Sequence, residues 1–140
     1  TRGEVYAVMP FDNTIVTLQL TGALVKLALE QSLHNDRVTQ VSGIRFTIDP
    51  SRPDMQRVTQ LTLADGAAID PAKTYLVAAN NFMATGGDHY DALAQGTNRI
   101  DTGRMIRDAM EAWVVAHCAG GKSYDLPADG RITELGGRSN

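Results

Sequence analysis

The sequence lacks several features that would narrow its class at once. Cys118 is the only cysteine among 140 residues, so an internal disulfide is excluded. No apolar run approaches the roughly 20 residues that a membrane-spanning helix needs, and residues 1–4 show no signal-peptide pattern. The formal net charge of −3 offers no basic surface for the phosphates of a nucleic-acid duplex. We therefore expect neither a membrane span nor binding to duplex nucleic acid.

Motifs of common catalytic sites are also missing. The histidines, His34, His89 and His117, are scattered without the spacing of metal ligands, so we expect no metal site in this chain. There is no Gly-x-Ser-x-Gly nucleophile elbow, and the double glycine at 86–87 is not followed by the lysine of a phosphate-binding loop. His117 and Cys118 are neighbours on a predicted helix and point in different directions, which argues against a Cys–His pair. No catalytic residue is predicted.

The composition is that of an ordinary globular domain. Hydrophobic residues make up 43% of the chain and charged residues 21%, both near the averages for folded proteins. A chain of 140 residues can bury about two-thirds of the surface that its unfolded form exposes. We expect residues 1–140 to form a single domain and the abrupt N-terminal start to reflect a fragment of a longer protein.

A helix is predicted to start at Thr21 and Gly22, after a β-branched strand over residues 14–20. Apolar or small residues recur at i, i+3, i+4, i+7 and i+8, which is the spacing of one helix face. They are Val25, Ala28, Leu29, Ser32 and Leu33. This face is expected to pack against a sheet.

A second helix is predicted with Asp101 or Thr102 as its N-cap and a stop at the glycines 120–121. Its apolar face comprises Met105, Ile106, Ala109, Met110, Trp113 and Val114. On the exposed side, the i, i+4 spacing favours ion pairs of Arg104 with Asp108 and of Arg107 with Glu111.

Extended segments alternate with turns over the rest of the chain. Short strands are expected at 38–41, 44–48, 57–63, 74–79 and 131–135, and a helical turn or strand at 4–9. The turn at 49–54 predicts a hairpin between its flanking strands, and the segment at 74–79 is apolar enough to be buried. Arg45 is expected to be a solvated strand residue. These elements predict an α+β fold with a mixed sheet covered by helices.

The segment at 80–90 is the strongest candidate for a binding loop. It places Phe82, Gly86, Gly87 and Asp88 directly after the predicted strand at 74–79. Glycines adopt positive φ and let the backbone approach a ligand, while a phenylalanine at a loop mouth offers a flat face to a planar ring. The combination favours recognition of a ring-bearing small molecule.

Together with the segments 9–14 and 69–75, this loop resembles the C-terminal, nucleoside-recognising domain of the 5′-nucleotidase and UDP-sugar hydrolase family. The resemblance covers residues 4–135, with the motifs in the family's order. It implies that Phe11 and Phe82 clamp the nucleobase from its two faces, and that Asp88 binds the ribose hydroxyls. Gly86 and Gly87 would permit the close approach of the sugar. Related enzymes add Asn and Arg side chains from an upstream segment that this chain does not contain.

The resemblance also implies the activity of the parent protein. In this family a separate N-terminal metallophosphatase domain carries two divalent metal ions, which activate water and polarise the phosphate. The parent is expected to hydrolyse nucleoside 5′-monophosphates or related nucleotides, and this chain alone is expected to be inactive. Relatives are periplasmic, secreted or attached to the cell surface, which is the location that the resemblance implies.

Three alternatives remain from the sequence. The chain could be a stand-alone nucleoside-binding module, or an interaction domain with a degenerate pocket, for which a buried Phe82 pointing away from Phe11 would be the sign. It could also belong to the related 2′,3′-cyclic-nucleotide phosphodiesterases with 3′-nucleotidase activity, although residues 85–90 look closer to the 5′-nucleotidase branch.

Overall fold

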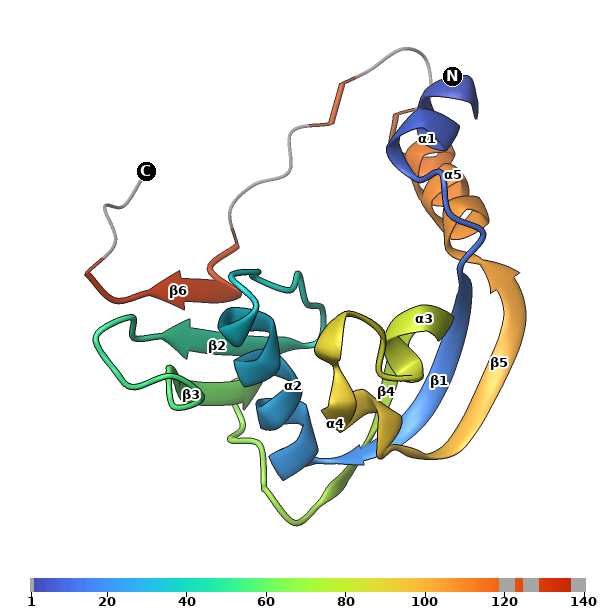
Figure 1. Cartoon of the computed structure of the whole chain (residues 1–140). Helices are drawn as coiled ribbons and strands as arrows, with labels where there is room; N and C mark the ends of the chain where they lie inside the picture. The colour runs from blue at the N-terminus through green and yellow to red at the C-terminus, as the bar shows by residue number, and fades with distance from the viewer. Residues whose placement is uncertain (1, 119–122, 125–128, 137–140) are drawn as a thin grey trace.

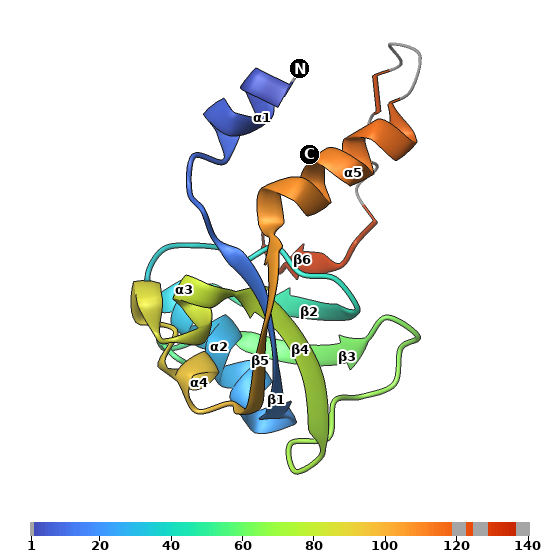
Figure 2. The same ribbon diagram turned by 90° about the vertical axis from the view of Figure 1, so that its right-hand side faces the viewer.

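The computed structural model describes residues 2–118, 123–124 and 129–136 (Figures 1 and 2). In chain order the elements are α1 (Arg2–Val8), β1 (Thr14–Thr21), α2 (Gly22–His34), β2 (Ile44–Ile48), β3 (Val58–Leu63), β4 (Thr74–Asn80), α3 (Asn81–Ala84), the 3₁₀ turn η1 (Gly87–His89), α4 (Asp91–Ala94), β5 (Thr97–Met105), α5 (Ile106–His117) and β6 (Ile132–Glu134). None of the helices within these described ranges is long and apolar enough to cross a membrane.

The described strands form two small sheets. The first sheet has the order β4-β1-β5 and is antiparallel throughout. The second has the order β3-β2-β6, in which β2 pairs antiparallel with β3 and parallel with β6. The predicted hairpin at 44–63 is therefore confirmed, and so is the α+β class with a mixed sheet. Helices lie against both sheets, and α1 and α5 contact each other beyond one end of the first sheet (Figure 1).

Helix α2 joins the two hydrophobic cores. It begins at Gly22, where the sequence predicted a helix start, and Thr21 caps it by accepting a hydrogen bond from the amide of Leu24 at 3.3 Å. Its predicted apolar face is buried along its whole length. Val25 and Ala28 belong to the core of the first sheet, while Leu29 and Leu33 belong to that of the second. One helix with a wide apolar face thus contributes to both cores.

A buried carboxylate ties α2 to the second sheet. Glu30 is only 2% exposed, and its two oxygens accept hydrogen bonds from the backbone amides of Arg57 and Val58 at 2.9 and 2.8 Å. A buried carboxylate without such partners would be strongly destabilising. Because the donors are backbone groups at the start of β3, Glu30 fixes where this strand begins relative to α2.

Two extended segments differ from their predictions. Residues 38–41, predicted as a strand, are irregular because they follow the end of α2 and bond back to it. The strand β4 was expected to be buried, but its side chains alternate between the two faces and Leu76 is 74% exposed. Val77 and Ala79 pack against the core of the first sheet, whereas the residues that alternate with them, including Leu76, face away from it.

The region 97–105 is the largest error of the sequence prediction. Asp101 and Thr102, expected to cap a helix, lie within β5, where the Asp101 carboxylate accepts from Thr14 Oγ1 and the Thr102 hydroxyl donates to the Ile15 carbonyl. Helix α5 begins at Ile106, after Met105. The strand was missed because its side chains are almost all exposed and show no apolar alternation.

Helix α5 keeps most of its predicted apolar face half-buried, but two of its residues depart from the prediction. Arg107, expected on the exposed side, is 7% exposed and turns toward α1 and the chain before β1, while Trp113 of the predicted apolar face is 40% exposed. Cys118 is half-buried at the end of α5, and the predicted stop at 120–121 lies outside the described residues. Arg45 is exposed, as predicted, and donates to the Asp129 carbonyl at 2.7 Å.

Candidate functional site

Antiparallel pairing brings the two predicted aromatic segments to the same end of the first sheet. Ile15 at the start of β1 pairs with Asn80 at the end of β4. Phe11 precedes β1 by three residues and Phe82 follows β4 by two, so both lie just beyond this end. Their side chains are 72% and 50% exposed. Residues that are 71 positions apart in sequence (82 − 11) thus lie next to the same end of the first sheet, and both side chains are accessible to a ligand. We call this end of the sheet, with Phe11 and Phe82, the aromatic edge.

The predicted binding loop at 80–90 begins with a short helix, α3, which carries Phe82. Asn80 caps α3 by accepting from the Met83 amide at 2.6 Å, and the Asn81 side chain accepts from the Phe82 amide at 2.9 Å. Thr85 closes the turn by donating its hydroxyl to the Phe82 carbonyl at 2.9 Å. Short polar side chains of this kind readily hydrogen-bond the backbone groups that are left without partners at helix ends and turns. They fix the backbone from which the Phe82 ring projects.

The two glycines have different physical roles. Gly86 has φ of +94°, a left-handed conformation that glycine adopts without strain. Gly87 has an ordinary φ, but a Cβ at this position would lie 2.6 Å from Cε1 and Cζ of Phe82. The Phe82 ring therefore lies against the Gly87 backbone, and a side chain there would displace it. Gly86 shapes the turn, and Gly87 makes room for the ring.

Asp88 and His89 continue the turn with φ of +54° and +62°. Non-glycine residues seldom adopt this region, although aspartate and histidine are among those that do so most readily. Such conformations cluster at ligand-binding sites because the surrounding structure has to hold them in place. Asp88 is consequently presented from an unusual backbone position directly after the glycines.

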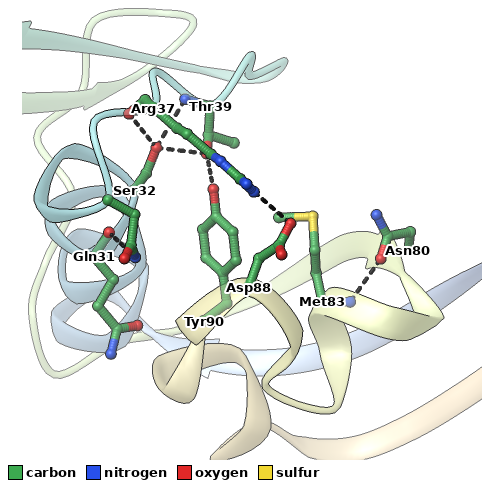
Figure 3. A network of polar contacts seen from close by, with 9 residues as sticks. Gln31, Ser32, Arg37, Thr39, Asn80, Met83, Asp88 and Tyr90 are labelled. Carbon is green, nitrogen blue, oxygen red and sulfur yellow. Dashed lines mark hydrogen bonds and ion pairs between the residues drawn. The ribbon is translucent and has the colours of Figure 1, made fainter.

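The Asp88 carboxylate forms an ion pair that the sequence did not predict. Nη1 of Arg37, in the chain after α2, lies 2.5 Å from Oδ2 of Asp88 (Figure 3). Both side chains are largely solvent-accessible, at 59% for Arg37 and 43% for Asp88. Because 51 residues separate the partners, no local spacing rule could have paired them.

A second polar contact links the same two segments. The Thr39 hydroxyl and the Tyr90 hydroxyl are hydrogen-bonded, and Thr39 also bonds to the buried Ser32 of α2 (Figure 3). Further along, the Ala92 amide donates to the Gln31 side chain at 3.0 Å. The segment that follows Gly87 is thereby attached to α2 and the residues after it at several points.

The Phe11 segment is held by Arg107. Nη2 of Arg107 donates to Asp12 Oδ1 at 2.8 Å and Nη1 lies 3.4 Å from the Met9 carbonyl, so the guanidinium bonds on both sides of Phe11. Its Cζ also lies 3.8 Å from the centre of the Tyr6 ring, a cation–π contact. The hydrogen bond to Asp12 holds the pKa of Arg107 above its usual value.

The described residues hold a cavity of about 690 Å³ beside these segments, and its character differs from that of the aromatic edge. Its lining is mainly apolar and comes from α2, the residues after it, β4 and the start of β2. It borders the segment at 80–90 through Met83 and Tyr90 only. None of the five predicted site residues lines it. The cavity and the aromatic edge are therefore separate features.

Metal ligands are not gathered in the described ranges. No group of three or more His, Cys, Asp or Glu side chains is placed there to hold a metal ion. The residues of the candidate site do not fit a metal centre. The arrangement offers two exposed aromatic rings, a carboxylate and a glycine turn, which suits binding rather than bond cleavage.

Comparison with known proteins identifies the family. A model of the 5′-nucleotidase C-terminal domain matches residues 1–95, a range that contains all five predicted site residues. The chain belongs to this family. The resemblance inferred from the motifs is thus confirmed.

The chain spans less than a third of the length of the relatives described here. It is 38% identical over 112 residues to the trifunctional nucleotide phosphoesterase protein YfkN of Bacillus subtilis, covering 74% of this chain and 8% of that protein. It is 35% identical over 120 residues to human 5′-nucleotidase, covering 77% of this chain and 21% of that protein. The solved 5′-nucleotidase precursor of Thermus thermophilus superposes with a TM-score of 0.86 at 35% identity, over 98% of this chain and 28% of that one.

Proposed function

We propose that residues 1–140 form the nucleoside-recognising domain of a metal-dependent hydrolase that removes phosphate from nucleoside 5′-monophosphates or related nucleotides. Phe11 and Phe82 clamp the nucleobase, Asp88 accepts hydrogen bonds from the ribose hydroxyls, and Gly86 and Gly87 shape the turn beside them. The observation that carries this proposal is the register of β1 with β4, which puts two exposed phenylalanines at one end of a sheet.

The chemistry of the clamp supports the assignment. Stacking a base on an aromatic side chain contributes about 1–3 kcal/mol, and two faces together would supply a large part of a micromolar affinity. Stacking accepts any base because every base has a π face. An ionised carboxylate is an acceptor only, which matches the donors of a vicinal diol. Phe82 is half-exposed, whereas an interaction domain with a degenerate pocket was expected to bury it.

The hydrolytic step belongs to another part of the parent protein. Two divalent metal ions, held by the metallophosphatase domain of the same protein, would activate the attacking water and polarise the phosphate. The substrate and that domain are the partners of this chain, which contributes specificity and no catalytic residue. By itself the chain is expected to be inactive.

Names of relatives bear on location and substrate range. Several relatives are venom 5′-nucleotidases of snakes, such as that of Crotalus adamanteus, which agrees with a periplasmic, secreted or cell-surface parent. The Bacillus relative is named as a trifunctional phosphoesterase. This name keeps open the alternative of a 2′,3′-cyclic-nucleotide phosphodiesterase with 3′-nucleotidase activity.

A nuclear magnetic resonance titration of the chain with adenosine tests the clamp, with ribose 5-phosphate as a ligand that has no base. Adenosine should shift the signals of Phe11 and of residues 82–88. Phe82→Ala should weaken its binding by about tenfold, within the range for loss of one stacking face. Tyr124→Ala is a matched control, because Tyr124 is 45% exposed and lies beside Trp113 of α5, away from the clamp.

Two results would contradict the proposal. One is the absence of shifts at millimolar adenosine, and the other is equal weakening by Phe82→Ala and Tyr124→Ala. Shifts caused by ribose 5-phosphate and adenosine alike, centred on residues 86–88 and independent of Phe82, would retain sugar recognition and remove the base clamp.

A further inference from the structure

We propose that Arg37 is a positioning residue for ribose recognition. It holds the Asp88 carboxylate in the orientation that accepts the sugar hydroxyls, and so raises the affinity for ribonucleosides over analogues without these hydroxyls. This inference rests on the proposed function of Asp88. It adds a residue from outside the binding segment and assigns it to the sugar rather than to the base.

The geometry leaves half of the Asp88 carboxylate available. Arg37 contacts Oδ2 through one nitrogen, Nη1, at 2.5 Å. Within the described residues, no hydrogen-bond donor reaches Oδ1 of Asp88. A carboxylate has about four acceptor positions, so a ligand hydroxyl can bind without displacing the arginine. Arg37 therefore orients the group and does not block it.

Arg37 can position Asp88 because its own backbone is fixed. Its carbonyl accepts from Ser32 Oγ at 2.7 Å, and its amide donates to the Ser32 carbonyl at 3.0 Å. Ser32 is 2% exposed on α2, the helix shared by both cores. The charged end of Arg37 is exposed, but the backbone that carries it is tied to this central helix.

The Thr39–Tyr90 bond reinforces the same attachment. The Thr39 amide and hydroxyl bond to Ser32 Oγ at 2.9 and 2.8 Å, and the hydroxyl also contacts that of Tyr90. Positions 37 and 39 thus hold positions 88 and 90, two residues apart on each side, and His89 between them has a positive φ (Figure 3). Ser32 is the common anchor of both contacts.

Such a contact should affect binding more than folding. Ion pairs this exposed contribute little to stability. A flexible side chain, however, loses conformational freedom when a ligand immobilises it, and a carboxylate that is already held avoids this loss. The benefit is confined to ligands that use the carboxylate. It should be absent for a nucleoside without the 2′ and 3′ hydroxyls.

Titrations of the whole chain with adenosine and with 2′,3′-dideoxyadenosine separate this role from a general one. Arg37→Met should weaken adenosine binding by about threefold to tenfold and leave dideoxyadenosine binding unchanged. Arg37→Lys should recover most of the loss, because the observed contact uses a single nitrogen. Arg52→Met is the matched control: Arg52 is an exposed arginine paired with Asp49 at 3.5 Å, and its removal should change neither affinity.

A measurement without ligand tests whether Arg37 holds the Asp88 segment in place. Amide hydrogen exchange of residues 86–90 should be faster in Arg37→Met than in the unmodified chain and in Arg52→Met. Unchanged exchange there would overturn the proposal.

The binding data distinguish the two levels of inference. Equal weakening of both nucleosides, or of neither, by Arg37→Met would overturn the role of Arg37 and leave the base clamp intact. If the unmodified chain binds neither nucleoside, the clamp is wrong and the ribose role of Arg37 with it.

Discussion

The Phe11 segment and the Phe82 segment are both held by an arginine that pairs with an aspartate, but the two arginines differ in burial. The Arg107 side chain is 8% exposed and contacts Asp12, a backbone carbonyl and the Tyr6 ring. The Arg37 side chain is 59% exposed and has the Asp88 carboxylate as its ion-pair partner. The same pair of residue types can therefore support the fold beside Phe11 and orient a ligand-binding carboxylate, Asp88, beside Phe82.

Burial decides which of these roles dominates. The Arg107 side chain is buried, and its aliphatic stem and guanidinium pack as part of the fold, although its partner Asp12 is 75% exposed. The Arg37–Asp88 pair is exposed to water and ions, where an ion pair has little net value for folding. We infer that the Phe11 side of the clamp is fixed and that the Phe82 and Asp88 side is adjustable.

Replacing Arg107 should have the largest effect, because it removes the anchor of the fixed side. Arg107→Met should lower the folding equilibrium constant by about tenfold, through loss of buried contacts and of the cation–π contact. Adenosine binding should fall as well, since the Phe11 segment loses both of its bonds to α5. Urea unfolding and calorimetric titration measure the two effects. Arg104→Met, at an exposed position of β5, should leave both unchanged.

The next effect should come from Gly87, which makes room for the Phe82 ring. In Gly87→Ala the new Cβ would lie 2.6 Å from the ring, and the half-exposed ring can swing away. Adenosine binding should therefore weaken by about tenfold, as for loss of the stacking face, with little change in the urea midpoint. In the Phe82→Ala background the same substitution should have almost no further effect on binding. Additive losses would show that Gly87 acts independently of the ring.

Gly86 should behave in the opposite way, with a loss of stability as its main effect. Its φ of +94° strains any residue with a side chain, although the nearest atom to a methyl group added there, Cβ of Ala94, is 3.5 Å away. Gly86→Ala should destabilise the fold by about 1 kcal/mol, as measured by urea unfolding. Gly86→Asn should be less harmful, because asparagine tolerates the left-handed region. Equal losses from both substitutions would argue against backbone strain as the cause.

Salt should have the smallest effect and sharpens the contrast between the two sides. Raising the ionic strength from about 0.01 M to 1 M shortens the Debye length from about 30 Å to 3 Å and weakens exposed pairs most. Amide exchange should become slightly faster at residues 86–90 and stay constant at residues 11–13. Sucrose at matched osmolality is the control for general solvent effects. A larger response at 11–13 would reverse the assignment of fixed and adjustable sides.

Local patterns were sufficient to predict the elements that have one buried face. The start at Thr21 and Gly22 and the repeat from Val25 to Leu33 predicted α2, and the β-branched run before it predicted β1. The strand β5 was not predicted, because an edge strand with exposed polar side chains has no apolar period to detect. Its place is set by pairing with β1, an interaction between distant parts of the chain.

The residues of the site likewise fall into those that local motifs predicted and those that depend on distant contacts. Family motifs pointed to Phe11, Phe82 and the glycine turn, and the structure shows both rings to be exposed at one end of a sheet. The two arginines were missed, since their aspartate partners lie 95 and 51 positions away. The sequence signal for Arg107 was even misleading, because i, i+4 spacing favoured a surface pair along α5. Long-range ion pairs leave no periodic trace in a single sequence.

The most direct test of the clamp is a measurement of nuclear Overhauser effects between adenosine and the chain in a saturated complex. The account predicts contacts from the H2 and H8 protons of adenine to the ring protons of both Phe11 and Phe82. Contacts from adenine to Val77 and Leu93 of the apolar cavity, with none to either phenylalanine, would contradict it and move the base-binding site to the cavity.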